Sequence, residues 1–216
     1  MKSGQVRAVF FDVGGTLIHP WPSVGEIYAA VAKRHGTVIS PDQAERAFHD
    51  SWETLKHGPM TVSRKDWWRE LVFLVLGQRN EACFNELFGF FAHAQAWRLY
   101  PDALEALNEV HTRGLHVGVI SNWDERLRPL LHELGIAPLL DSITVSCEVG
   151  AEKPDPKIFH VALRSAGVEA TRALHVGDAL NKDVRGAEAV GMKGVHLDRE
   201  GLAPGKSIPD LRQLKL

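Results

Sequence analysis

The stretch VFFDVGGTLIHP, from Val9 to Pro20, decides the fold that the sequence predicts. It begins with an apolar run typical of a short buried strand, which ends at Asp12, and two glycines follow. Parallel strands present their carboxyl ends at one edge of a sheet, so an aspartate in this place is a candidate catalytic group. Further apolar runs that end in the same way would supply the other strands of such a sheet.

Residues 6–11 form the first of these runs, and 115–121 (LHVGVIS), 142–146 (SITVS), 172–177 (RALHVG) and 193–197 (KGVHL) are further candidate strands. Helical patterns separate them. Strands that alternate with helices favour an α/β protein with a doubly wound, mainly parallel sheet.

A long insertion follows the first strand and contains no convincing strand. Its helical patterns cover residues 23–36, 40–58, 63–77 and 80–94. We therefore predict a helical domain at 18–96, inserted into a core domain formed by 1–17 and 97–216. Trp67 and Trp68, with Leu71, Phe73 and Leu74, have the spacing of a helix, so we interpret them as the core of the inserted domain rather than as an aromatic ligand site.

The amino-acid composition limits which kinds of molecule the protein is expected to bind. Apolar residues make up 44% of the 216 residues, and 25 Lys and Arg against 27 Asp and Glu give a net charge of −2. This charge favours neither nucleic acid nor an anionic membrane. Cys83 and Cys147 belong to no metal-ligand pattern, and no run is long enough for a signal peptide or a membrane span. We expect a cytoplasmic protein whose partner is a small molecule.

Four short motifs follow the candidate strands in order. They are FDVGGTL with Asp12 and Thr16, ISN with Ser121 and Asn122, EKPDP with Lys153, and VGDALNKD with Asp178 and Asp183. Together they resemble the haloacid dehalogenase-like hydrolase superfamily, and the match covers nearly the whole chain. SRKDWW and VISNWDERL are similar to a eukaryotic subgroup, the haloacid dehalogenase-like hydrolase domain-containing proteins. The resemblance implies a doubly wound α/β core with a helical cap.

A carboxylate is a plausible nucleophile toward phosphorus. It would form an aspartyl-phosphate intermediate, which replaces one slow hydrolysis of the phosphate ester by two easier displacement steps. Asp12 is this candidate. It repels an anionic substrate, so a cation must neutralise the approach, and Lys153 supplies one charge. Ser121 and the amide of Asn122 are expected to bind the phosphoryl oxygens, and Thr16 to hold the loop.

The remaining positive charge is expected from Mg²⁺. Carboxylate oxygens are hard ligands that suit this ion, and Asp178 and Asp183 follow the same candidate strand. The resemblance implies that Asp12 and the backbone carbonyl of Gly14 complete the protein's share of the ligands.

Gly14 departs from the pattern of the family's phosphatases, which have a second aspartate there to protonate the leaving oxygen. General acid-base catalysis is worth about 10² to 10⁴ in rate. We therefore expect weak activity, biased toward acidic leaving groups such as acyl or aryl phosphates. His19 is a possible substitute acid, although it more simply packs beside its neighbours, and Asp124 is another, although it is better placed as the N-cap of the next helix.

Three alternatives remain. Dehalogenases of the family also lack this acid, but they use no Mg²⁺ and lack the acidic residues of the fourth motif. Phosphonatases keep the metal with a small residue at this position and need a cap lysine, for which Lys33 and Lys56 are the nominees. The third alternative is a phosphate-binding or regulatory protein that has lost turnover. The sequence favours a Mg²⁺-dependent phosphatase acting on small phosphate esters.

Overall fold

The computed structural model describes residues 5–55, 64–202 and 206–216. The chain divides into two compact units, one formed by the residues up to His19 and from Leu99 onward, the other by Pro20–Arg98. The chain passes between the units through strands β2 (Ile18–Pro20) and β3 (Trp97–Leu99), which pair as a small sheet. At three residues each, these two strands are too short for the sequence to predict them.

The first unit contains a six-stranded sheet in the order β5-β4-β1-β6-β7-β8. Every neighbouring pair in it is parallel. The five predicted strands are all present, and the edge strand β8, of only two residues, was not predicted. The strands are β1 (Ala8–Phe11), β4 (His116–Ser121), β5 (Ser142–Val145), β6 (Ala173–Gly177), β7 (Lys193–Leu197) and β8 (Ser207–Ile208).

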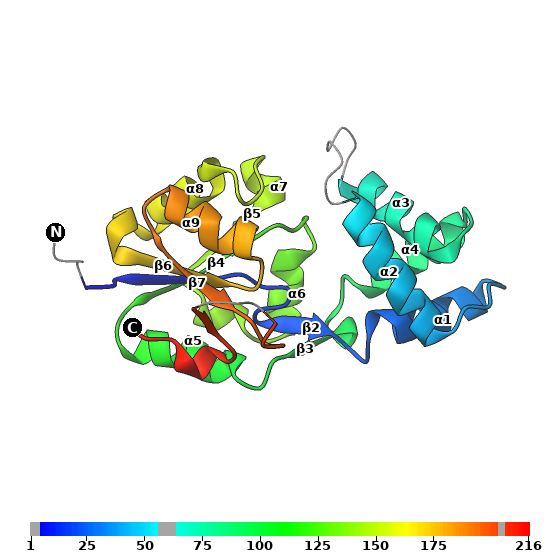
Figure 1. The fold of residues 1–216 in the computed structure, drawn as a ribbon, viewed down its shortest axis with the longest axis horizontal. Coiled ribbons are helices and arrows are strands. Elements are labelled where there is room, and N and C mark those ends of the chain that lie inside the picture. Colours follow the sequence, from blue (N-terminus) through cyan, green and yellow to red (C-terminus); the bar gives the residue numbers. More distant parts are fainter. Residues whose placement is uncertain (1–4, 56–63, 203–205) are drawn as a thin grey trace. The chain divides into compact units, whose positions relative to one another are not determined.

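Helices cover both faces of this sheet, with α8 and α9 on one face and α5 on the other (Figure 1). Ile158 and Phe159 of α8 pack against Phe10 of β1 and Ile120 of β4 in a fully buried cluster. The prediction of a doubly wound α/β fold is therefore confirmed. The helices are α5 (Ala103–Thr112), α6 (Leu127–Glu133), α7 (Ser146–Val149), α8 (Pro156–Ala166) and α9 (Gly186–Ala189), with short turns at η2 (Ala137–Leu139), η3 (Ala170–Arg172) and η5 (Leu211–Gln213).

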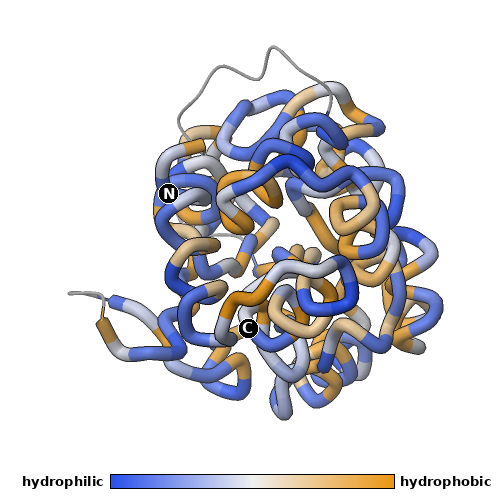
Figure 2. The backbone as a smooth tube through the Cα atoms, turned by 90° about the vertical axis from the view of Figure 1, so that its right-hand side faces the viewer, coloured by the Kyte–Doolittle hydropathy of each residue, from blue (hydrophilic) through white to orange (hydrophobic). Residues whose placement is uncertain are grey.

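The second unit is helical, as predicted. Ser23 caps its first helix by accepting a hydrogen bond from the amide of Glu26, and Asn80 caps its last by accepting one from the amide of Cys83. Hydrophobic and hydrophilic residues alternate along the backbone (Figure 2), as in helices that bury one side. The elements are α1 (Val24–Arg34), α2 (Pro41–Leu55), α3 (Arg64–Leu76), α4 (Glu81–Phe90) and η1 (Ala94–Ala96).

Aromatic residues form the interior of the helical unit. The ring of Trp67 lies 5.1 Å from those of Trp52 and Trp68, edge to face in both pairs. Of the predicted core, Trp67, Leu71 and Phe73 are buried, whereas Trp68 is half-buried and Leu74 is 50% exposed. Among the described residues no helix is long and apolar enough to cross a membrane.

Candidate active site

Central strands of the sheet end together at one edge. Phe11, the last residue of β1, is in register with Val119 of β4 and Val176 of β6. The amide of Asp12 then donates to the carbonyl of Val176 at 2.9 Å. This alignment brings the end of β1 beside the loops that follow the neighbouring strands.

A cluster of three carboxylates lies at this edge. Asp12, Asp178 and Asp183 each offer an oxygen, and these atoms all lie within 4.8 Å of one another. Asp12 and Asp183 are buried, whereas Asp178 is exposed. The structure thus brings together the three acidic side chains that the sequence predicted as metal ligands.

Lys153 joins this cluster from the loop before α8. Its side chain is 3% exposed, and Nζ donates to Oδ1 of Asp12 and to Oδ1 of Asp183, both at 2.6 Å. A third bond of 2.8 Å runs to the carbonyl of Ile120. The ammonium is fully engaged between the two buried carboxylates, as a buried charge must be.

The charges in this network shift its pKa values. Burial, with the repulsion of Asp183 and Asp178 added and the attraction of Lys153 opposing, raises the pKa of Asp12 to about 6. Burial works against ionisation of Asp183 too, but Lys153 and His175 outweigh it and lower the pKa of Asp183. For Asp178, desolvation and then the charge of Asp183 raise the pKa, although solvent reaches this side chain.

The same two carboxylates act on the lysine. Burial disfavours its charged form, but Asp12 and Asp183 overcome that cost and raise the pKa of Lys153. One ammonium therefore faces three carboxylates, and the ionised cluster carries an excess of negative charge. Hard oxygen donors with excess negative charge fit a divalent cation such as Mg²⁺.

Two glycines that the sequence analysis did not single out allow the acidic side chains to approach. Gly15 has a φ of +79°, and a Cβ on it would lie 2.6 Å from Oδ2 of Asp178. A Cβ on Gly177, the last residue of β6, would lie only 2.3 Å from Cγ of Asp183. In the sequence, each is marked only by its position next to a site residue. Gly15 belongs to the GG pair that follows Asp12, and Gly177 directly precedes Asp178.

Asp183 is oriented by further contacts within the core. It lies on a short π-helix, η4 (Leu180–Arg185), a form frequent at functional sites. Its Oδ1 lies 3.0 Å from Nε2 of the fully buried His175, and its Oδ2 accepts the amide of Ala179 at 3.0 Å. His175 was not predicted from the sequence, where its only signal is that it is a polar residue inside an otherwise apolar strand.

The side chain of Asn122 holds the backbone of Lys153. Its side-chain amide donates to the carbonyl of Lys153 at 2.9 Å, and its Oδ1 accepts the amide of Lys153 at 2.7 Å. The side chain therefore fixes the backbone of the lysine, which leaves the backbone amide of Asn122 for the predicted phosphate contact. Ser121 is buried at the end of β4, and the buried Thr16 points Oγ1 at Asp178, 3.4 Å away.

The two candidate substitute acids have other neighbours. The ring of His19 packs against Tyr100, with 4.7 Å between ring centroids, and its role as an acid stays a prediction. The predicted N-cap role of Asp124 is wrong, because α6 begins at Leu127 and its N-cap residue is Arg126. Asp124 instead accepts hydrogen bonds from the amide and guanidinium of Arg126, so its carboxylate is already paired.

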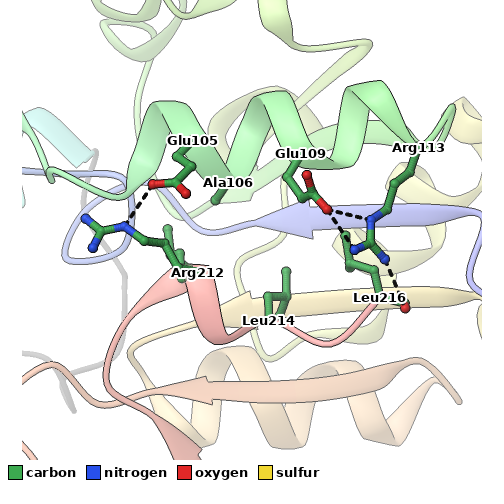
Figure 3. Close-up of a pocket in the computed structure, with 8 residues that line it drawn as sticks. Glu105, Ala106, Glu109, Arg113, Arg212, Leu214 and Leu216 are labelled. Atoms are coloured by element: carbon green, nitrogen blue, oxygen red, sulfur yellow. Dashed lines mark hydrogen bonds and ion pairs between the residues drawn. The ribbon is translucent and has the colours of Figure 1, made fainter.

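Cavities open among the described residues of the first unit. One of about 310 Å³ separates α5 from the C-terminal segment, where Arg212 pairs with Glu105 and Arg113 with Glu109 (Figure 3). It contains no member of the acidic cluster. The second, of about 270 Å³, reaches that cluster through Asp178, and its other lining residues are Gly15, Tyr100, His196, Leu197, Asp198, Arg199 and Glu200.

Known proteins are similar to this chain in sequence. A family model described as haloacid dehalogenase-like hydrolase matches residues 6–191. The human haloacid dehalogenase-like hydrolase domain-containing protein 3 is 34% identical over 204 residues, covering 87% of this chain and 80% of that protein.

Solved structures share the fold. A HAD phosphatase from Thermococcus onnurineus is 26% identical with a TM-score of 0.71, over 96% of this chain and 95% of that one. A HAD-hydrolase from Bacillus subtilis, solved with bound magnesium, has a TM-score of 0.81 at 15% identity over 97% of each chain.

Proposed function

The chain belongs to the haloacid dehalogenase-like hydrolases, and from this premise we propose that it is a Mg²⁺-dependent phosphatase acting on small phosphate esters through Asp12. The observation that carries the proposal is the buried network in which Lys153 bonds Asp12 and Asp183 beside a third carboxylate. A nucleophilic carboxylate, a fixed cation and an acidic metal site are the parts that phosphoryl transfer requires.

In this proposal Asp12 attacks phosphorus while the leaving oxygen departs with the electrons of the P–O bond. Water then displaces the carboxylate and releases phosphate. Lys153 holds Asp12 through Oδ1 and offsets the charge of the incoming phosphoryl group. Ser121 and the backbone amide of Asn122 bind its oxygens, and Thr16 supports the loop after the nucleophile.

Asp12, Asp178, Asp183 and the carbonyl of Gly14 would hold the Mg²⁺ ion. When bound, the ion would supply positive charge that stabilises the phosphoryl group. The same charge would lower the pKa of Asp12 and so favour its ionised form, which is the form that attacks. We further propose that the core domain, 1–17 and 97–216, carries the chemistry and that the helical domain, 18–96, is a cap that selects the substrate.

The decisive experiment replaces the nucleophile. Asp12→Asn keeps the size of the side chain but cannot form the acyl-phosphate, so Mg²⁺-dependent phosphate release from p-nitrophenyl phosphate or acetyl phosphate should fall by at least about 10³. Asp155→Asn is the matched control, because Asp155 is exposed and asparagine caps α8 equally well. An unchanged rate in Asp12→Asn would show that the proposed function is wrong.

The alternatives predict different products. A 2-haloacid dehalogenase would release halide with and without a chelator, whereas the acidic cluster favours a metal-dependent reaction. A phosphonatase needs a cap lysine: Lys33 is exposed on α1, and Lys56 lies outside the described residues. A binding or regulatory protein would bind phosphate in an Asp12-dependent way without turnover. Assays of halide, of phosphonoacetaldehyde cleavage and of phosphate binding on one preparation separate them.

A further inference from the structure

Trp123 lies where the side chain of residue 14 would project. A Cβ built on Gly14 would be 3.1 Å from Cζ3 and 3.9 Å from Cη2 of the indole. Ordinary carbon contacts are about 3.5–4.0 Å, so even one methyl group there presses on the ring. A side chain at position 14 would therefore require the indole to move by a few tenths of an ångström from its present position.

The main chain of Trp123 is firmly held. Its amide donates to Oγ of Ser146 at 3.1 Å, and the same hydroxyl donates back to the carbonyl of Trp123 at 3.0 Å. The amide of Cys147 adds a bond of 3.3 Å to that carbonyl. Because Ser146 is buried directly after β5, these bonds oppose a shift of the loop, and we expect a side chain at position 14 to displace the ring rather than the backbone.

Trp123 also directly follows Ser121 and Asn122, which the proposed function assigns to the phosphoryl oxygens. The half-buried ring therefore flanks the phosphate site on the side of Gly14. An indole offers an apolar face and stacks on other rings, but it provides no proton donor for an oxygen above that face.

We propose that Trp123 is a specificity-determining residue that replaces a general acid at position 14 with an apolar platform, so that the enzyme accepts phosphate compounds whose leaving group departs unprotonated and packs on the indole. This proposal rests on the proposed phosphatase function. It assigns aryl phosphates, with acyl phosphates second, as the substrate class.

The chemistry of the leaving groups supports this class. A phenol has a pKa near 10 and a carboxylic acid one near 4, so both leave as stable anions. An alkoxide resembles hydroxide, whose conjugate acid has a pKa of about 15.7, and needs a proton as the P–O bond breaks. Of these leaving groups, only the aryl group can also be stabilised by stacking on the indole of Trp123.

The test is a double-mutant cycle between Gly14→Asp and Trp123→Ala, assayed with phenyl phosphate and with a simple alkyl phosphate. Gly14→Asp alone should raise kcat/KM for the alkyl phosphate less than tenfold, because the indole obstructs the carboxylate. The double variant should raise it by about 10² to 10⁴. Gly89→Asp is the matched control, because a Cβ on Gly89 of α4 meets nothing within 4 Å, and it should change neither rate.

The platform role has its own measurement. Trp123→Ala should raise KM for phenyl phosphate about two- to tenfold and leave KM for acetyl phosphate unchanged, whereas Trp123→Phe should retain most of the aryl preference. Circular dichroism and thermal unfolding establish that each variant is folded. If Trp123→Ala does not fold, the cycle is run with Trp123→Phe, whose smaller ring should permit an intermediate gain.

Either of two results would overturn the proposal. One is a full gain from Gly14→Asp alone, with nothing added by removing the indole; the other is an unchanged KM for phenyl phosphate in Trp123→Ala. Asp12→Asn, measured beside these variants, keeps the two hypotheses apart. Phosphate release that survives Asp12→Asn refutes the phosphatase mechanism itself, whereas its loss in Asp12→Asn together with either result above refutes only the role of Trp123.

Discussion

Asp178→Asn should make the metal-free protein more stable and at the same time abolish its stabilisation by Mg²⁺. Oxygens of Asp178, Asp12 and Asp183 lie within 4.8 Å of one another, and one lysine opposes all three charges. Without the ion, Asp178 mainly adds repulsion. With the ion, the same carboxylate is a proposed ligand, so we expect a single substitution to act with opposite signs in the two states.

The magnitude follows from the distance. Two unit charges 4.8 Å apart repel by roughly 1 kcal/mol in water and by roughly 3.5 kcal/mol at an effective dielectric constant of 20. The value in water is the appropriate one because Asp178 is exposed, and its lost attraction to Lys153 offsets part of the gain. We expect a net stabilisation of about 1 kcal/mol, which raises Tm by about 2–4 °C in a chain of this size.

Thermal unfolding with EDTA and with Mg²⁺ at about 100 times its Kd measures both effects. Ligand binding at that ratio stabilises by about 2.7 kcal/mol, so the wild-type Tm should rise by about 5–10 °C and the Tm of Asp178→Asn should not respond. Asp155→Asn should behave as wild type, since it removes an exposed charge and keeps the cap of α8. A lower Tm of Asp178→Asn in EDTA, or a retained Mg²⁺ shift, would refute the reasoning.

Three further substitutions test the network. Lys153→Met strands two buried carboxylates and should destabilise the metal-free protein by about 3–5 kcal/mol in urea unfolding; a loss below about 1 kcal/mol would contradict the network. Gly177→Ala forces its Cβ against Asp183 and should cost about 1–3 kcal/mol and weaken Mg²⁺ binding in a calorimetric titration, whereas unchanged binding would exclude this contact. Burial opposes ionisation of Asp102, but Arg199 and a backbone amide outweigh it and lower its pKa, so its contribution is present above about pH 4 and is lost as pH falls through the folded-state value. Asp102→Asn should therefore be less stable than wild type at pH 6, with the difference shrinking at pH 3, and a constant difference would rule this out.

The sheet was predictable because its central strands are buried on both faces. Such strands form nearly continuous apolar runs, as in HVGVIS of β4 and ALHVG of β6, and each ends at a residue that changes the pattern. The short strands β2, β3 and β8 carry no such pattern, since two or three residues cannot show a period. These strands form because the rest of the fold brings their segments next to each other or next to β7.

The site was predictable as a set of positions but not as a set of contacts. Strand ends at one edge of a parallel sheet place Asp12 after β1 and Asp178 after β6, and Asp183 follows on η4 in the same loop. The direction of each side chain depends on its neighbours, which is why Asn122 holds the backbone of Lys153 and why α6 begins three residues after Asp124. No spacing in the sequence specifies these two arrangements.

The position of Trp123 changes what the missing acid means. From the sequence alone, Gly14 is a deletion, and an aspartate there would simply restore the lost group. In the structure the indole of Trp123 lies in the space beside Gly14, and three hydrogen bonds hold the backbone of Trp123 in place. Lys153 bonds the two buried carboxylates beside the exposed Asp178, so under the proposed function the parts needed for phosphoryl transfer are present and only the handling of the leaving group differs. In that proposal the absent acid at position 14 and the indole at position 123 determine the specificity together, and we expect that both positions must be altered to reverse it.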